Sequence, residues 1–300
     1  MHLKSIVRFL VIAFLPAVGL QLFAISRGLE KSGRPWLLAL MWVPALAAMT
    51  AGRDTRRAAM RMLRRAGGRM LLVGLAVGWI PVILRNALLW VTHTGEWNKA
   101  NFPLSSGSDA IAGIVGMRML LGQGAQSAAH FALNLALSVL AGSVLSAVIG
   151  ALGEELGWRG VLQPALEQRV GPWKATLAVG AIWAYWHLPV NLAGYNDAAH
   201  PGLTASMLFP LSLIATSFGL GWITTRSQSV WPAALAHGAH NVASSVTLLQ
   251  SNSWIAENVA TLAGDLLIGL LFAWLVLRSR FRGSGAPASV LFPPLACPKC

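Results

Sequence analysis

Cysteine is almost absent from this chain of 300 residues, and its two cysteines, Cys297 and Cys300, lie at the very end. A disulfide framework therefore does not hold the fold. The Cys-x-x-Cys spacing matches half of a zinc or redox site, but one such pair is weak evidence for either. Because residues 283–300 contain Gly, Ser and Pro, we expect them to form a disordered tail.

Charged residues are also scarce, at 11% of the chain, whereas 55% of the residues are hydrophobic. An average soluble domain has about 25% charged residues. The mean hydropathy is +0.60, and several apolar runs reach about 20 residues, enough to cross the hydrocarbon core as a helix. These features exclude an ordinary soluble domain. They predict an all-α polytopic membrane protein.

Acidic residues are few, with 10 Asp and Glu against 23 Lys and Arg, which gives a net charge of +13. Such a charge can indicate a nucleic-acid binder. Here the positive charges lie between apolar runs, where they orient the protein and meet anionic lipid. We therefore expect the bilayer as a partner, and no nucleic acid.

The apolar runs predict about eight transmembrane helices, at residues 6–25, 36–51, 70–91, 131–153, 175–193, 208–225, 231–249 and 255–277. The first run begins like a signal peptide but lacks a convincing cleavage site, so we expect a retained anchor. Residues 53–69 carry seven arginines and one acid, which predicts an amphipathic helix in the headgroups. Residues 92–126 are polar and predict a loop with a short amphipathic or re-entrant piece.

Loop charges predict the orientation, since cytoplasmic loops are rich in Lys and Arg. Basic residues follow the second, fourth and last runs, whereas residues 191–202 and 251–254 contain none. This pattern places both termini in the cytoplasm, although Arg27, Lys31 and Arg34 then fall outside. Composition and length favour the plasma membrane of a bacterium. We divide the chain into N-terminal helices (1–130), a catalytic core (131–250), a last helix (251–282) and the tail (283–300).

Polar side chains interrupt three of the apolar runs. Glu154 and Glu155 follow the fourth run, and ionisable groups at membrane depth are functional candidates. The i, i+4 spacing allows Glu155 to pair with Arg159, while Glu154 projects about 100° away. His187 lies in the fifth run, and the seventh run holds two side chains on one helix face, His237 and Asn241.

These residue types suit two kinds of chemistry. A carboxylate with an imidazole can activate water as a general base, and a second His with an Asn amide can stabilise an oxyanion. Glu154, His187 and His237 could equally hold Zn²⁺, with an open fourth position for water. The sequence does not separate the two.

Other polar and aromatic residues have simpler interpretations. We interpret His240 as a hydrogen-bond partner between helices and Asp265 as a polar packing contact. Trp183, Tyr185 and Trp186 fit packing or an interfacial aromatic belt.

Three motifs together resemble one known family. They are Glu154-Glu155-x-x-x-Arg159, an aromatic-x-x-x-His element from Trp183 to His187, and His237-x-x-x-Asn241. Their order and spacing resemble the CAAX prenyl protease/bacteriocin-processing family, the intramembrane endopeptidases of the type II CAAX protease and bacterial Abi group. The resemblance covers residues 131–249. The aromatic of the second motif is commonly Phe, and we expect the Trp here to serve packing with little effect on chemistry.

The resemblance implies hydrolysis of a peptide bond within the membrane, in a cavity open to the cytoplasm. Glu154 with His187 would activate the water, and His237 with Asn241 would stabilise the oxyanion. Glu155 and its partner Arg159 would shape the site. Both a metal-dependent and a metal-free glutamate mechanism have been proposed for the family, so zinc stays an open cofactor.

Two other functions fit parts of the sequence. A scaffold or immunity protein of the same fold would bind a membrane peptide without cutting it. A proton-coupled transporter would use the buried Glu and His residues as a relay, but transporters more often show inverted repeats and paired broken helices, and the sequence shows neither by eye. A prenylated substrate is not expected in a bacterium, which leaves peptide maturation, self-immunity or cleavage of a membrane anchor.

Overall fold

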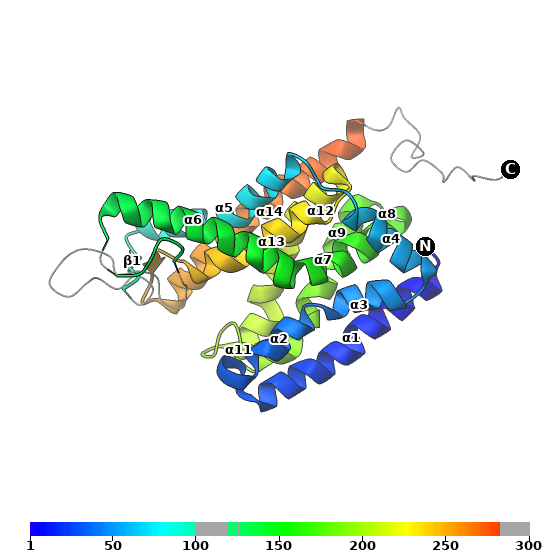
Figure 1. Ribbon diagram of the computed structural model, residues 1–300, viewed down its shortest axis with the longest axis horizontal. Coiled ribbons are helices and arrows are strands. Elements are labelled where there is room, and N and C mark those ends of the chain that lie inside the picture. Colours follow the sequence, from blue (N-terminus) through cyan, green and yellow to red (C-terminus); the bar gives the residue numbers. More distant parts are fainter. Residues whose placement is uncertain (100–118, 125, 283–300) are drawn as a thin grey trace.

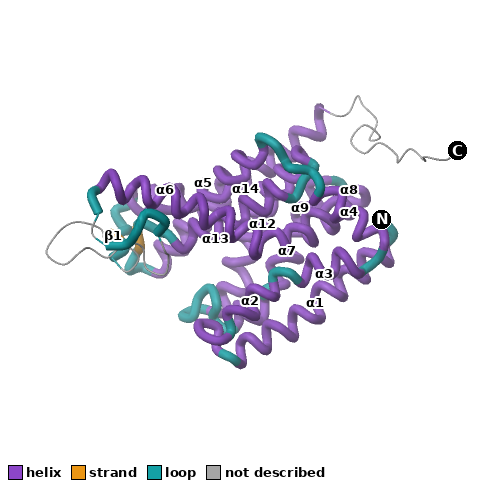
Figure 2. Tube along the Cα trace, viewed as in Figure 1, coloured by secondary structure: helices purple, strands orange, loops and turns teal. Residues whose placement is uncertain are grey.

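The structure is a computed structural model that describes residues 1–99, 119–124 and 126–282 (Figure 1). The predicted tail with its cysteine pair and most of the predicted loop at 92–126 lie outside these residues. Figure 2 shows that nearly all of the described chain is helical. One small antiparallel ribbon joins β1 (Glu96–Trp97) to β2 (Leu249–Gln250). The predicted all-α class is confirmed.

Among the described helical elements, four are π-helical turns, written η. In chain order they are α1 (Leu3–Ser26), η1 (Gly28–Ser32), α2 (Arg34–Leu40), α3 (Val43–Thr50), α4 (Arg53–Leu63), α5 (Met70–Val91), α6 (Ala128–Ser146), η2 (Ala147–Ala151), α7 (Leu152–Gly157), η3 (Trp158–Leu162), α8 (Gln163–Val170), α9 (Pro172–Trp186), α10 (Leu188–Leu192), α11 (Pro201–Leu203), η4 (Thr204–Leu208), α12 (Phe209–Ser227), α13 (Trp231–Ser245) and α14 (Trp254–Arg282).

Fewer helices than the predicted eight are long and apolar enough to cross a membrane. Within the described ranges there are five, or six if a bent pair counts as one span. That pair consists of residues 34–50 and α4, and the chain bends by 118° between them. Two other predicted spans form α9 and α13, each of 15 residues, and are therefore only about 22 Å long. The chain is an integral membrane protein with several short or broken helices.

The predicted polar loop after the fourth run is helical in the structure. Residues 128–170 form one long helical segment made of α6, η2, α7, η3 and α8. Arg159 is fully buried in this segment, and the Glu155 carboxylate one turn earlier offsets its charge. Arg159 therefore belongs to the interior, and it does not support the loop-charge topology.

The predicted amphipathic segment forms a helix at α4. Thr55, Ala59 and Met62 are buried along one side, while Arg53, Arg56, Arg57 and Arg61 are exposed. The helix ends at Leu63, earlier than predicted, and the rest of the basic segment leads into α5.

Two groups of helices meet around α7. α3 lies between α1 and α7, and α13 packs against α5, α6 and α7 (Figure 1). α12 packs against α9 and α14. As a result, α7 lies between the N-terminal helices and the bundle formed by the later ones.

Glycines allow the helices around α7 to approach closely. A Cβ added to Gly153 would lie 2.5 Å from the Met41 carbonyl oxygen, and a Cβ on Gly238 would lie 2.4 Å from the Ala147 amide nitrogen. Small residues at helix contacts are typical of membrane bundles, because they bring backbones together. These contacts hold α7 and α13 near enough for their polar side chains to meet.

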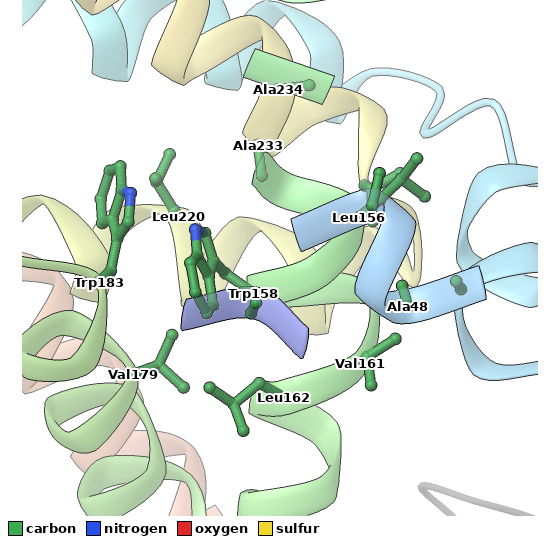
Figure 3. Packing of buried hydrophobic residues seen from close by; sticks show 14 of the residues in the cluster. Ala48, Leu156, Trp158, Val161, Leu162, Val179, Trp183, Leu220, Ala233 and Ala234 are labelled. Carbon is green, nitrogen blue, oxygen red and sulfur yellow. The ribbon is translucent and has the colours of Figure 1, made fainter. Parts of the chain in front are cut away.

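A cluster of large apolar side chains surrounds the same region, and Figure 3 shows part of it, including Trp158, Trp183 and Leu220. The ring of Trp158 lies edge-on to Phe9 and to Trp186, with centroids 6.0 and 5.8 Å apart. This packing ties α1 and α9 to η3.

Candidate active site

Both glutamates point into the bundle from α7. Glu154 is 2% exposed and Glu155 is fully buried. Their short helix lies between the π-helical turns η2 and η3, and such turns occur often at functional sites. Because the glycine side of α7 packs against α3, the two carboxylates face the later helices.

Glu155 is the centre of a buried polar network. Its Oε1 accepts a hydrogen bond from Nη1 of Arg159 at 3.1 Å and lies 2.9 Å from Nδ1 of His237. Nη2 of Arg159 donates to Oγ of Ser217, which donates to the Thr176 carbonyl, both at 3.2 Å. The predicted pairing of Glu155 with Arg159 is confirmed. Sequence reasoning did not find Ser217, one of two serines in the apolar run at residues 208–225.

Glu154 points to a different partner. Its Oε2 accepts a hydrogen bond from the indole Nε1 of Trp183 at 2.6 Å. The described residues show no direct hydrogen bond between Glu154 and His187. The 100° separation between the two glutamates therefore leads to different contacts, as the helical spacing predicts.

Trp183 lies among the candidate residues. Its ring centroid is 5.1 Å from that of His237 and 6.2 Å from that of His187. The Arg159 guanidinium lies 4.4 Å above the same ring, in a cation–π contact. Trp183 packs in the buried apolar cluster, as expected, and in addition donates its hydrogen bond to Glu154.

Each candidate histidine has one ring nitrogen fixed by an acceptor. Nδ1 of His187 lies 2.9 Å from the Trp183 carbonyl oxygen, and Nδ1 of His237 contacts the Glu155 carboxylate. Since a carbonyl and a carboxylate only accept, both Nδ1 atoms carry the proton. Nε2 is thus the atom of each ring that is left for a water or a substrate.

His187 lies where α9 ends and α10 begins, and the buried Gln21 of α1 spans this break. The Gln21 amide donates to the Trp186 carbonyl at 2.9 Å and accepts from the Val190 amide at 3.3 Å. Gln21 was not identified from the sequence. The sequence feature that could have indicated it is a lone amide side chain within the first apolar run.

Asn241 is the one predicted site residue that the structure does not bring into the cluster. It lies on α13 one turn after His237 but is exposed, and no hydrogen bond to it is found within the described ranges. Its role in oxyanion stabilisation stays a prediction.

His240 of α13 and Asp265 of α14 lie together, away from the cluster around Trp183. Oγ of Ser212 on α12 donates to the buried Asp265 of α14, and His240 lines the same cavity as Asp265. The cross-helix bond confirms Asp265 as a polar packing contact. The cavity that His240 and Asp265 line has a volume of about 180 Å³.

A larger cavity of about 410 Å³ lies between α4, η3 and α8. Arg57, Arg61 and Glu167 line it, and Arg159 forms part of its wall. Glu154, His187 and His237 do not line it. Arg159 therefore lies between this cavity and the cluster around Trp183.

The three predicted metal ligands do not form a ready metal site as they are arranged. In the part of the chain that the structure describes, no three His, Cys, Asp or Glu side chains are placed to hold an ion. We therefore derive no step through a metal.

The fold and the cluster define a polytopic helical membrane protein with carboxylates and imidazoles buried in its bundle. Residues 125–243 match the family model described as Type II CAAX prenyl endopeptidase Rce1-like. CAAX prenyl protease 2 of Methanococcus maripaludis is 25% identical over 114 residues, which cover 37% of this chain and 42% of that protein. The match thus spans less than half of the relative. Both findings support the CAAX protease family and confirm the resemblance inferred from the motifs.

Proposed function

We propose that this protein is an intramembrane endopeptidase that cleaves a peptide bond of a membrane-associated peptide or protein. The observation that carries the proposal is the convergence of Glu154, His187 and His237 around Trp183 inside the bundle. All of these residues fall within the matched range, 125–243. We further propose the plasma membrane of a bacterium as its location, with both termini in the cytoplasm.

Glu154 is the general base in this proposal. It takes a proton from a water whose orientation Nε2 of His187 sets, and the resulting hydroxide adds to the carbonyl carbon of the substrate. The protonated Glu154 then gives its proton to the amine nitrogen as the C–N bond breaks. The products are a carboxylic acid and an amine.

His237 supports the negative charge that develops on the carbonyl oxygen. Its Nδ1–H is committed to Glu155, so Nε2 can donate to the oxyanion only when the ring is an imidazolium. The buried Glu155 carboxylate stabilises that cation, while Arg159 holds the carboxylate in place. In this proposal Asn241, which is exposed on α13 one turn after His237, supplies the second donor to the oxyanion.

The test is cleavage of an internally quenched peptide containing a transmembrane segment, with the purified protein in nanodiscs. We expect Glu154→Gln and His187→Ala to lower kcat by about 100-fold or more, as for loss of a general base. Asp265→Asn is the matched control, because Asp265 is buried outside the cluster. Full cleavage by Glu154→Gln would contradict the assignment.

The same assay addresses the mechanism and the alternatives. Zinc would be held by Glu154, His187 and His237, so inactivation by 1,10-phenanthroline with recovery on adding zinc would overturn the metal-free step. A peptide that binds to the wild-type protein but is never cut would indicate a scaffold or immunity protein. Solute flux that is lost in Glu154→Gln would indicate a transporter. A farnesylated peptide is included among the test substrates, because the relative is named a CAAX prenyl protease.

A further inference from the structure

Trp183 makes the one side-chain hydrogen bond that Glu154 has within the described ranges of the chain. The donor is the indole Nε1–H, the acceptor is Oε2, and the distance is 2.6 Å. Both residues are almost fully buried, at 3% and 2% exposure. A hydrogen bond to a charged group away from water is among the stronger ones in proteins.

The direction of this N–H is fixed from several sides. Arg159 lies over the indole face at 4.4 Å, and the imidazole of His237 lies against the ring at a 67° angle. Figure 3 shows the indole within the buried cluster that also holds Trp158 and Leu220. Because the ring has no room to turn, the N–H is held toward Glu154 before any substrate binds.

The same residue also orients a second candidate group. Its backbone carbonyl receives the Nδ1–H of His187, one helical turn later, at 2.9 Å. The side chain of Trp183 therefore sets the position of the carboxylate, while its backbone sets the ring orientation of the histidine. Phe at this position would keep the backbone contact and lose the side-chain one.

The bond has two chemical consequences for Glu154. It uses one lone pair of Oε2, which leaves Oε1 as the less engaged oxygen for the proton of the attacking water. It also supplies a donor to a carboxylate that burial removes from water. A base held in one orientation loses less entropy on reaching the transition state.

We infer that Trp183 is a positioning residue, whose indole N–H holds Glu154 in the orientation in which it acts as the base. This inference rests on the proposed function. It adds a donor at a position where packing alone was expected.

The experiment separates the effect of the indole N–H on cleavage from the effect of the ring's shape. Trp183 is replaced by 3-benzothienylalanine, which has a sulfur in place of the N–H and nearly the same shape, and in parallel by Phe. Trp158 provides the control, because its Nε1 is buried without a hydrogen-bond partner among the described residues. The same replacement at Trp158 removes an N–H that binds nothing.

The assay is cleavage of the quenched transmembrane peptide in nanodiscs, followed as kcat and KM from pH 5 to 9. We expect the replacement at Trp183 to lower kcat by about 10-fold to 100-fold, as for a hydrogen bond to a charged group, with KM within about two-fold. The replacement at Trp158 should change neither kcat nor its pH profile, and equal melting temperatures would show that all variants are folded.

Three different results would overturn the inference. If the wild-type protein cleaves the peptide and the Trp183 replacement keeps its kcat and pH profile, Trp183 only packs while the proposed function stands. If the wild-type protein cleaves none of the peptides, the proposed function fails and the positioning role fails with it. An equal loss of kcat in the Trp158 control would also overturn the inference, since ring chemistry in the cluster would then matter more than the N–H.

Discussion

Two carboxylates and one guanidinium are buried together at the centre of this membrane bundle. The desolvation cost of such charges is high, and it is offset only where each charge has a partner and good hydrogen bonds. Glu155 and Arg159 satisfy this through each other and through His237 and Ser217. Glu154 has an N–H donor instead of a cation at hydrogen-bond distance, which keeps its carboxylate available as a base.

At the scale of single residues, we predict that Arg159→Met destabilises the protein by about 3–5 kcal/mol, because Glu155 is left charged and buried. The double variant with Glu155→Gln should recover most of this loss, since no unpaired charge remains. Unfolding of both variants in mild detergent, followed by circular dichroism, gives the comparison. A double variant no more stable than Arg159→Met would show that the charge of Glu155 is not the cause.

At the scale of elements, close contacts between helices position the cluster. α13 approaches α6 and η2 through Gly238, the residue after His237, and α7 approaches α2 and α3 through Gly153. The π-helical turns on both sides of α7 change the direction in which successive side chains project. The break between α9 and α10 ends the helix at His187, where Gln21 binds both sides.

We therefore predict that Gly238→Ala impairs both stability and cleavage. Its Cβ would meet a backbone nitrogen at 2.4 Å, which cannot rotate away, so α13 must shift and His237 must move from Glu155. Overpacking of this kind costs about 1–3 kcal/mol. The control is Gly19→Ala on α1, where nothing lies within 4 Å of the added Cβ. Melting temperatures and cleavage rates of both variants test this, and a Gly238→Ala protein as stable and active as the control would contradict it.

At the scale of the whole molecule, the start of α1, α4 and the end of α14 lie at the same end of the long axis (Figure 1). The placement of both termini in the cytoplasm stays a prediction. In the connection between α10 and α11, Asp197 accepts hydrogen bonds from Trp254 and Thr204. It thereby joins this connection to the start of α14.

Asp197 should make this junction sensitive to acid. Burial alone would raise its pKa, but hydrogen bonds from Trp254, His200, Thr204 and Ala199 outweigh that effect and hold the pKa below its ordinary value of 3.8. The bonds thus contribute stability above about pH 4, and this contribution is lost as the pH falls through the lower pKa of the folded state. We expect Asp197→Asn to reduce the fall in melting temperature between pH 5 and pH 3. An identical fall in the variant would contradict this role.

The sequence by itself determined the features that depend on short stretches of chain. Apolar runs predict a helical membrane protein, because a helix in lipid must satisfy its own backbone. The pairing of Glu155 with Arg159 follows from one helical turn, and the order of three motifs indicates the family. Such features require no knowledge of which helix lies beside which.

Only the tertiary structure decided how these pieces meet. The sequence could not show that α9 and α13 are short, that Arg159 is buried, or that Asn241 is exposed, because apolar runs do not reveal where a helix breaks or what covers it. It also could not show that Trp183, 29 residues after Glu154, donates to that carboxylate. Glycine contacts and helix breaks set these distances, and the candidate site depends on them.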